Sequence, residues 1–192
     1  MHDEPPTRRR LQAFSGAKSV GHLSQRDEEL WCAMTSEDYN PRMESTLSFL
    51  TLLTSGLFAG AALYVTAVEH PARMSQGASI ALQEFRPSYK RAAPLQAALA
   101  VICFLCSLVV WRLTGQWAWL AGGLSVGAVV PFTFAFIMTT NRLLLDAALP
   151  PKDEEALILL TKWARLHAVR TYLGLLGFAI LLFQSIQQAR SH

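Results

Sequence analysis

Four long apolar stretches follow a polar N-terminal region and are separated by shorter polar segments. We expect them as helices over about residues 46–69, 93–112, 117–140 and 152–187. At about 1.5 Å per residue, roughly 20 helical residues cross the ~30 Å hydrocarbon core of a bilayer. The pattern therefore predicts an all-α, four-helix transmembrane bundle, a multi-pass integral membrane protein whose membrane the sequence does not specify.

Residues 1–42 show no sustained apolar period. They mix prolines, the run Arg8-Arg9-Arg10 and the acidic run Asp27-Glu28-Glu29. This composition is typical of a disordered polar leader, and the acidic residues are unlike a transit peptide. We therefore expect two parts, a leader over 1–42 and a membrane domain over 43–192.

The composition supports a membrane location. Hydrophobic residues make up 52% of the chain and charged residues 16%, whereas soluble domains average about a quarter charged. The net charge of +3 is modest, and the basic residues gather at the ends of apolar runs. This distribution gives no support to nucleic-acid binding and favours lipid headgroups as the counter-charge.

Prolines set the expected ends of the first helices. Pro71 disfavours helical geometry at the residue before it, so the first helix should end near Glu69 or His70. A short surface-lying helix over about 79–85 should then be broken by Pro87.

The remaining connections differ in length. The short turn at residues 114–116 makes the second and third helices an antiparallel hairpin. Pro150 and Pro151, followed by acidic residues, are typical of a helix start, so we expect one long final helix. The longer first and third loops carry most of the basic residues, and the positive-inside rule places both in the cytosol.

Three of the helices carry a stripe of small residues that leads to polar side chains near the same leaflet. The stripes are Gly56, Gly60 and Ala67 to His70; Gly123, Gly127, Phe134 and Met138 to Asn141; and Gly177 and Gly174 to Arg170, His167 and Trp163. Polar groups buried in a membrane cost free energy unless they are paired, so their convergence indicates a site. Interfacial anchoring by tryptophan and arginine is the alternative for each residue alone.

The polar segment after the first helix would roof this site. Arg86, Tyr89 and Arg91 suit either contact with a ligand or attraction to headgroups, and Lys90 suits headgroups. A pocket at this level would admit an aromatic or lipidic molecule from the bilayer.

The cysteines indicate no metal or disulfide framework. Cys103 and Cys106 form a C-x-x-C pair in the middle of the second span, where a thiolate would be poorly solvated. Apolar packing is the preferred interpretation, and Cys32 has no pairing pattern. No metal site is expected.

Four blocks of the sequence resemble a known family. They are residues 56–73 (GLFAGAALYVTAVEHPAR), 85–96 (FRPSYKRAAPLQ), 131–141 (PFTFAFIMTTN) and 162–170 (KWARLHAVR). They are similar to a family of small four-helix membrane proteins, largely a domain of unknown function, whose characterised members are fungal anthrone oxygenases. The resemblance covers about residues 50–185. It implies a four-helix membrane protein that oxidises an anthrone to an anthraquinone, with dioxygen as co-substrate and no established metal or flavin.

Such an oxidation, an oxidoreductase reaction of the monooxygenase type, assigns roles to the polar residues. A base must remove an acidic ring C–H proton, and a cationic donor must hold the resulting enolate. His167 is the candidate base with His70 as second choice, and Arg170 is the candidate oxyanion partner. The expected substrate contacts are Trp163, Asn141, Tyr89, Arg86 and Arg91.

Two other functions are compatible with the sequence. His70 and His167 could ligate a haem-type cofactor between helices, although no His/carboxylate motif with metal spacing is present. Alternatively, the chain is a non-catalytic bundle that binds lipid, with or without homo-oligomerisation. The preferred prediction is oxidation of an aromatic or quinol-type small molecule without a cofactor.

Overall fold

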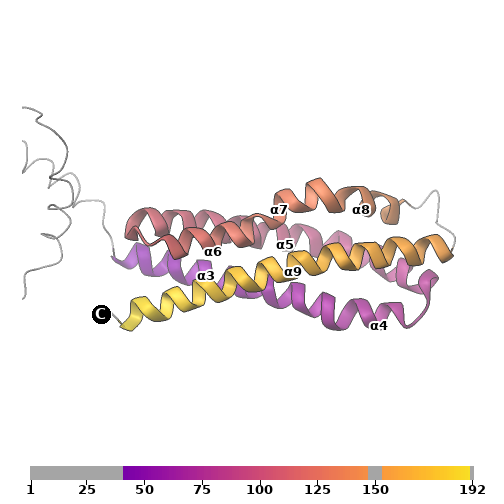
Figure 1. The fold of residues 1–192 in the computed structure, drawn as a ribbon, viewed down its shortest axis with the longest axis horizontal. Coiled ribbons are helices and arrows are strands. Elements are labelled where there is room, and N and C mark those ends of the chain that lie inside the picture. The colour runs from indigo at the N-terminus through magenta and orange to yellow at the C-terminus, as the bar shows by residue number, and fades with distance from the viewer. Residues whose placement is uncertain (1–40, 147–152, 191–192) are drawn as a thin grey trace, which may run out of the picture. The chain divides into compact units, whose positions relative to one another are not determined.

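Residues 41–146 and 153–190 are described by a computed structural model (Figure 1). The helices are labelled α3 (Pro41–Tyr64), α4 (His70–Met74), α5 (Ala78–Thr114), α6 (Trp117–Gly127), α7 (Val129–Phe132), α8 (Met138–Leu145) and α9 (Asp153–Arg190). Two π-helical turns, η1 (Val65–Glu69) and η2 (Thr133–Ile137), join α3 to α4 and α7 to α8. Most of the predicted leader, residues 1–40, lies outside the described residues.

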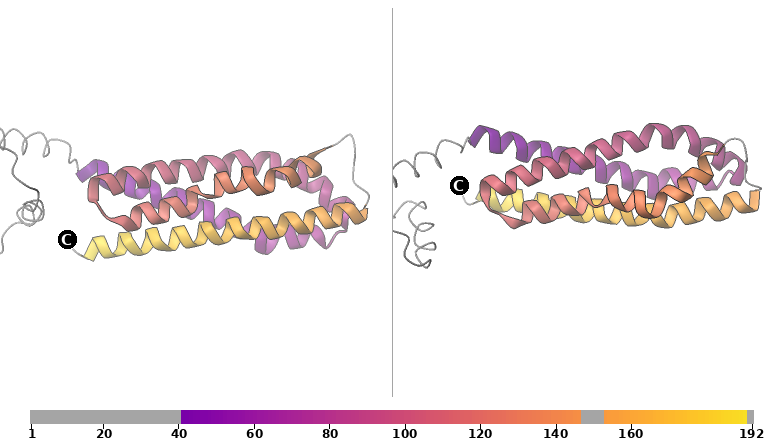
Figure 2. Two further views of the ribbon diagram at one scale, coloured as in Figure 1. Left: turned by 45° about the horizontal axis from the view of Figure 1, so that its top comes forward. Right: turned by 90° about the horizontal axis from the view of Figure 1, so that it is seen from above.

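The elements form four antiparallel rods that pack side by side (Figure 2). Each rod is long and apolar enough to cross a membrane: Pro41–Met74, Ala78–Thr114, Trp117–Leu145 and Glu154–Arg190. The predicted all-α transmembrane bundle is thus confirmed. The ends of α4 and α8 and the starts of α5 and α9 lie at one end of the bundle, and the hairpin turn at 115–116 lies at the other (Figure 1).

The rods are longer than a bilayer core, and most of the excess lies at the end where α4 and α8 end and α5 and α9 begin. Charged side chains are absent from residues 46–68, 92–111, 117–141 and 171–189. The hydrogen bond between Thr66 and His167 of α9, and the one from Asn141 to Tyr89, bring the ends of these ranges to the same height along the bundle. The bundle therefore has a charge-free layer and, beyond it, a polar end.

The prediction that the first helix ends near Pro71 is wrong, because the helix continues to Met74. In η1 the backbone N–H of His70 bonds to the carbonyl of Val65, five residues back. This shift in register leaves Pro71 in the first turn of α4, where a backbone N–H is not needed. The rod therefore passes the proline without stopping.

The predicted break at Pro87 is also wrong. Pro87 and Pro94 both lie inside the continuous helix α5, so residues 79–85 extend the second span instead of forming a separate helix. Each proline removes one backbone hydrogen bond, and both prolines are on the exposed side of the helix. The carbonyls four residues earlier, at Gln83 and Lys90, are in exposed residues too, where water or headgroups can satisfy them.

The third rod does not keep the face that its sequence predicts. Phe134 is 66% exposed although Asn141, seven residues later, is fully buried. The π turn η2 adds a residue to the helix turn and thereby rotates α8 about the rod axis. As a result, Ile137, Thr140, Asn141 and Leu144 face inward.

The glycine contacts differ from the predicted GxxxG interface. Gly60 and Ala67 are exposed, and a Cβ at Gly60 would meet nothing within 4 Å. The close contact is instead between α6 and α9, where a Cβ at Gly177 would lie 2.8 Å from the carbonyl oxygen of Gly122. On α9, Gly174 likewise accommodates the ring of Phe58.

The apolar core has two parts with the polar residues between them. One lies in the charge-free layer and includes Phe58, Ala100, Trp119 and Leu181. The other lies at the polar end and includes Phe85, Ile137, Leu160 and Trp163. Cys103 belongs to the first core as a free, buried thiol, as the packing interpretation predicts.

Candidate active site

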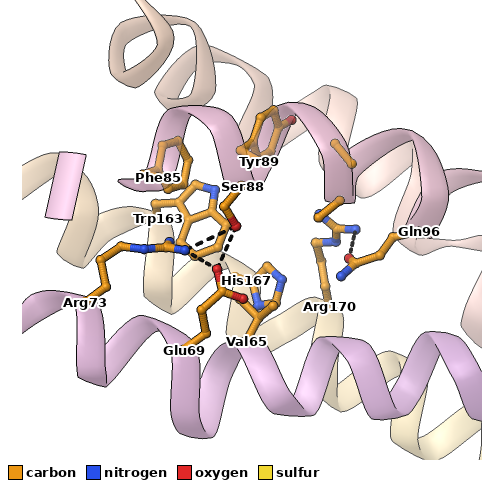
Figure 3. Close-up of a pocket in the computed structure, with 12 residues that line it drawn as sticks. Val65, Glu69, Arg73, Phe85, Ser88, Tyr89, Gln96, Trp163, His167 and Arg170 are labelled. Atoms are coloured by element: carbon orange, nitrogen blue, oxygen red, sulfur yellow. Dashed lines mark hydrogen bonds and ion pairs between the residues drawn. The ribbon is translucent and has the colours of Figure 1, made fainter. Parts of the chain in front are cut away.

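Two adjoining cavities lie where the charge-free layer meets the polar end. The first is lined by side chains of η1, α4, α5 and α9 (Figure 3). Its polar lining residues are Glu69, Arg73, Ser88, Tyr89, Gln96, His167 and Arg170. About 20 Å³ is free for the centre of a water-sized molecule, which is room for about one water.

His167 lies between α9 and the first rod. Its ring stacks on Trp163, with centroids 4.7 Å apart, and its Nδ1 lies 3.0 Å from the Thr66 hydroxyl. The residue is 3% exposed and lines the first cavity. Trp163 also contacts Phe85 edge-to-face at 5.0 Å, so the imidazole is held against a rigid aromatic wall.

Arg170 is a buried cation with a neutral partner. Its Nη2 donates to the Gln96 Oε1 over 3.0 Å (Figure 3). Both residues are less than a tenth exposed. Its Nε has no hydrogen-bond partner, and among the described residues no carboxylate pairs with it. A buried guanidinium without a counter-charge is costly, so this position suits an anionic or strongly polarised ligand.

Tyr89 lies beside Arg170 in the lining of both cavities. Its hydroxyl accepts a hydrogen bond from the Asn141 Nδ2 over 2.6 Å, and its ring stacks on Phe85. Because the hydroxyl oxygen is engaged as an acceptor, its proton is left to donate to a ligand. Asn141 thus acts through Tyr89.

Glu69, Arg73 and Ser88 close the first cavity on the side of the loops. Glu69 accepts from the Arg73 guanidinium and, over 2.6 Å, from the Ser88 hydroxyl. The Arg73 guanidinium also lies 5.8 Å from the centre of the Phe85 ring. Arg73, unlike Arg170, is therefore paired with a carboxylate.

The second cavity is larger and mainly apolar. About 220 Å³ is free for the centre of a water-sized molecule, between α5 on one side and α7, η2 and Met138 on the other. Pro94, Ala97 and Phe134 line it and are exposed on the outer surface, so it opens toward the lipid-facing side. Tyr89, Gln96 and Arg170 are shared with the first cavity and separate the two spaces.

The structure brings together only some of the side chains that the sequence singled out. Trp163, His167, Arg170 and Tyr89 line the first cavity, and Asn141 reaches it through Tyr89. His70 is buried against Trp163, with ring centroids 5.3 Å apart, and lines neither cavity.

Arg86 and Arg91, the other two predicted substrate contacts, line neither cavity. Arg86 donates to the carbonyls of Leu144 and Asp146, over 2.9 and 2.5 Å, and so caps the end of α8. Arg91 is exposed and lines neither cavity. Their predicted contact with a ligand is not a feature of this geometry, because Arg86 is occupied by backbone and Arg91 points outward.

Sequence reasoning missed several residues of the site. The sequence could have indicated Gln96, because it is the one amide side chain among residues 92–111. Glu69 and Arg73 carried a different signal, the i, i+4 spacing of an ion pair on a helix. Thr66 and Thr171 carried none, since threonine is common in membrane helices and their meeting depends on the packing of two rods.

The positions of the described His, Cys, Asp and Glu side chains indicate whether they could bind a metal ion or a haem. Within residues 41–146 and 153–190, no group of three or more His, Cys, Asp or Glu side chains is placed to hold a metal ion. His70 and His167 both pack against the indole of Trp163. A porphyrin between the two imidazoles would have to displace this ring.

A comparison with known families matches residues 85–180, half of the chain, to the model described as anthrone oxygenase. The match runs from α5 into α9 and includes Tyr89, Gln96, Asn141, His167 and Arg170. No curated protein and no solved structure matches the chain. The chain belongs to the anthrone oxygenase family.

Proposed function

We propose that this protein is a membrane-embedded oxygenase that converts a hydroxylated anthrone, or a similar quinol-type aromatic, to the quinone. The observation that carries the proposal is the position of Arg170, a buried cation with only an amide as partner, between a polar and an apolar cavity. An anthrone has matching parts: an oxygen that becomes anionic on deprotonation, and a flat apolar ring system.

The two cavities suggest how such a substrate binds. The apolar rings occupy the second cavity, which is lined mainly by residues of the charge-free layer and is open to the lipid side. The substrate oxygen then meets Arg170 and the Tyr89 hydroxyl at the partition. The first cavity, with room for about one water, suits dioxygen or the water produced.

The chemistry requires one base and one oxyanion site. His167 takes a proton from the ring methylene, and Arg170 with Tyr89 stabilises the negative charge on the substrate oxygen. Dioxygen accepts electrons from the carbanion and forms a C–O bond at that carbon, and the proton from His167 completes a hydroperoxide. Cleavage of its O–O bond with loss of the second methylene hydrogen gives the quinone carbonyl and water. One oxygen atom enters the product and the other leaves as water.

The test uses the full chain in lipid nanodiscs with a hydroxylated anthrone. Dioxygen uptake and quinone absorbance are measured together, after subtraction of the spontaneous oxidation in empty nanodiscs. We expect one dioxygen consumed per quinone formed, and a loss of about 100-fold or more in His167→Gln and Arg170→Gln. The exposed residue Lys162 provides a control, Lys162→Gln, which should keep full turnover.

Other outcomes would support the alternative functions. Unchanged turnover in both variants would remove the proposal. Altered lipid dependence in both, without a reaction in the wild type, would favour the non-catalytic bundle. A Soret band in the purified protein would favour a haem-type cofactor.

A further inference from the structure

Two threonine hydroxyls and two backbone carbonyls form a chain of hydrogen bonds that ends at the His167 ring. The Thr66 Oγ1 lies 3.0 Å from the His167 Nδ1 and 2.8 Å from the Thr171 Oγ1. The Thr171 Oγ1 lies in turn 3.1 Å from the carbonyl oxygen of Ala62 and 3.2 Å from that of His167. The chain crosses from α9 to η1 and back.

The available hydrogens and the two carbonyls beside Thr171 together favour one direction of this chain. A carbonyl only accepts, so Thr171 satisfies either of the two carbonyls it faces only if its single hydroxyl proton points to one of them, as is usual for threonine in a helix. The Thr171 oxygen is then an acceptor for Thr66, whose own proton is thereby used. Thr66 can consequently meet His167 only as an acceptor, and the proton between them belongs to the His167 Nδ1.

The reverse direction is unfavourable. If Thr66 donated to the His167 Nδ1, Thr171 would have to donate to Thr66. The Thr171 oxygen would then face two carbonyl oxygens without a hydrogen between them. Thr171 is 5% exposed, so bulk water is not at hand to relieve that repulsion.

We propose that Thr66 and Thr171 hold His167 in the tautomer that carries its proton on Nδ1, so that Nε2 is the proton-accepting atom. This inference rests on the proposed function for the catalytic use of Nε2, but the tautomer itself does not. Thr66 and Thr171 are positioning residues, because they act through His167. Within the described part of the chain, Nε2 has no hydrogen-bond partner, and the ring lines the first cavity.

The π turn explains why Thr66 is available for this role. Thr66 lies in η1, where the wider turn changes the direction of side chains relative to a continuous α-helix. It is the residue of the first rod that reaches the His167 ring by a hydrogen bond. The same turn that lets the rod pass Pro71 thereby orients the candidate base.

Nitrogen-15 NMR of the full chain in nanodiscs tests the tautomer directly. The chain has five histidines, and the signals of His167 are those absent from the spectrum of His167→Gln. We expect a protonated Nδ1 and an unprotonated Nε2 in the wild type. Thr66→Val should shift the signals toward a mixture of tautomers, Thr66→Ser should restore the wild-type pattern, and Thr139→Val, at an exposed threonine, should leave it unchanged.

Anthrone turnover in the same variants tests the catalytic part. Thr66→Val and Thr171→Val should lower kcat by about 10- to 100-fold with KM little changed, and Thr66→Ser should recover most of it. An unprotonated Nδ1 in the wild type would overturn the inference whatever the activity. The expected tautomer in a protein that oxidises no anthrone would uphold the relay and count against the proposed function alone. Full turnover in Thr66→Val with an altered tautomer would overturn the positioning role.

Discussion

The Nη2 of Arg170 lies 3.0 Å from the Oε1 of Gln96, so the described bundle meets a buried positive charge with an amide. The amide fixes the direction of the guanidinium without neutralising it. Arg73, one helix turn from Glu69, is the contrasting case, because its charge is matched within the protein. The difference separates a structural cation from one that is free to attract a ligand anion.

The shape of the guanidinium should matter as well as its charge. In Arg170→Lys the positive charge remains, but the planar donor group that reaches Gln96 and is proposed to hold the substrate oxygen is lost. We expect kcat/KM for anthrone oxidation to fall by about 100- to 1,000-fold. The exposed Arg165 supplies the matched control, and Arg165→Lys should be indistinguishable from wild type. Equal activity of the two variants would show that Arg170 does not contact the reacting atoms.

Gln96→Glu should raise stability and lower activity together. A carboxylate at this position would pair with Arg170 and satisfy a charge that is already buried. We expect the Tm in detergent to rise by about 2–4 °C, and kcat/KM to fall at least tenfold because the cation is no longer free for the substrate. Gln96→Leu removes the hydrogen bond instead and should lower both the Tm and the activity. Full turnover in Gln96→Glu would contradict the oxyanion role of Arg170.

A larger side chain at one position of α5 should fill the second cavity. Ala97 and Ala98 are adjacent exposed alanines of α5, and only Ala97 lines the cavity. Ala97→Phe should raise the KM for an anthrone about tenfold or more, because its ring occupies the space proposed for the substrate. Ala98→Phe changes the hydrophobicity by the same amount at a lipid-facing position and should leave KM unchanged. If both variants had the wild-type KM, the rings would bind elsewhere.

The close contact between α6 and α9 should tolerate no side chain. A methyl group at Gly177 would lie 2.7 Å from the Val126 side chain and 2.8 Å from the Gly122 carbonyl, so Gly177→Ala should destabilise the bundle by about 1–3 kcal/mol. Gly60→Ala should be neutral or slightly stabilising, because the space around it is open. Unfolding of both variants in mixed micelles measures the difference. A larger effect at Gly60 would mean that a second copy of the chain packs on that face.

Substitutions of Arg86 and Arg91 should differ in their effect on the stability of the protein, and neither should change its activity. Arg86→Ala removes two hydrogen bonds to the carbonyls at the end of α8 and should cost roughly 1–3 kcal/mol. Arg91→Ala should have little effect, because the side chain is exposed. Neither variant should change kcat/KM below its unfolding temperature. A specific loss of turnover in Arg91→Ala would return it to the substrate contacts that the sequence suggested.

The sequence by itself determined the class of fold and the height along the bundle at which the candidate site residues lie. Runs without charged residues specify membrane rods, because a charge in hydrocarbon is expensive wherever it lies in the chain. Short turns impose antiparallel neighbours, so the ends of alternate runs meet at the same leaflet. The face of α9 was also readable, because Trp163, His167, Arg170 and Gly174 follow one uninterrupted helical period.

The tertiary structure decided which side chains face one another. The π turns η1 and η2 each add a residue to a helix turn, so a helix face predicted on one side of the turn does not continue on the other. The predicted faces from Gly60 to His70 and from Gly127 to Asn141 are both interrupted in this way. Packing between rods also selected Gly177 over Gly60 and placed Gln96 against Arg170. The local sequence sets the periodicity of each helix, but the rotation and contact of neighbouring helices depend on the energy of the whole packed interface.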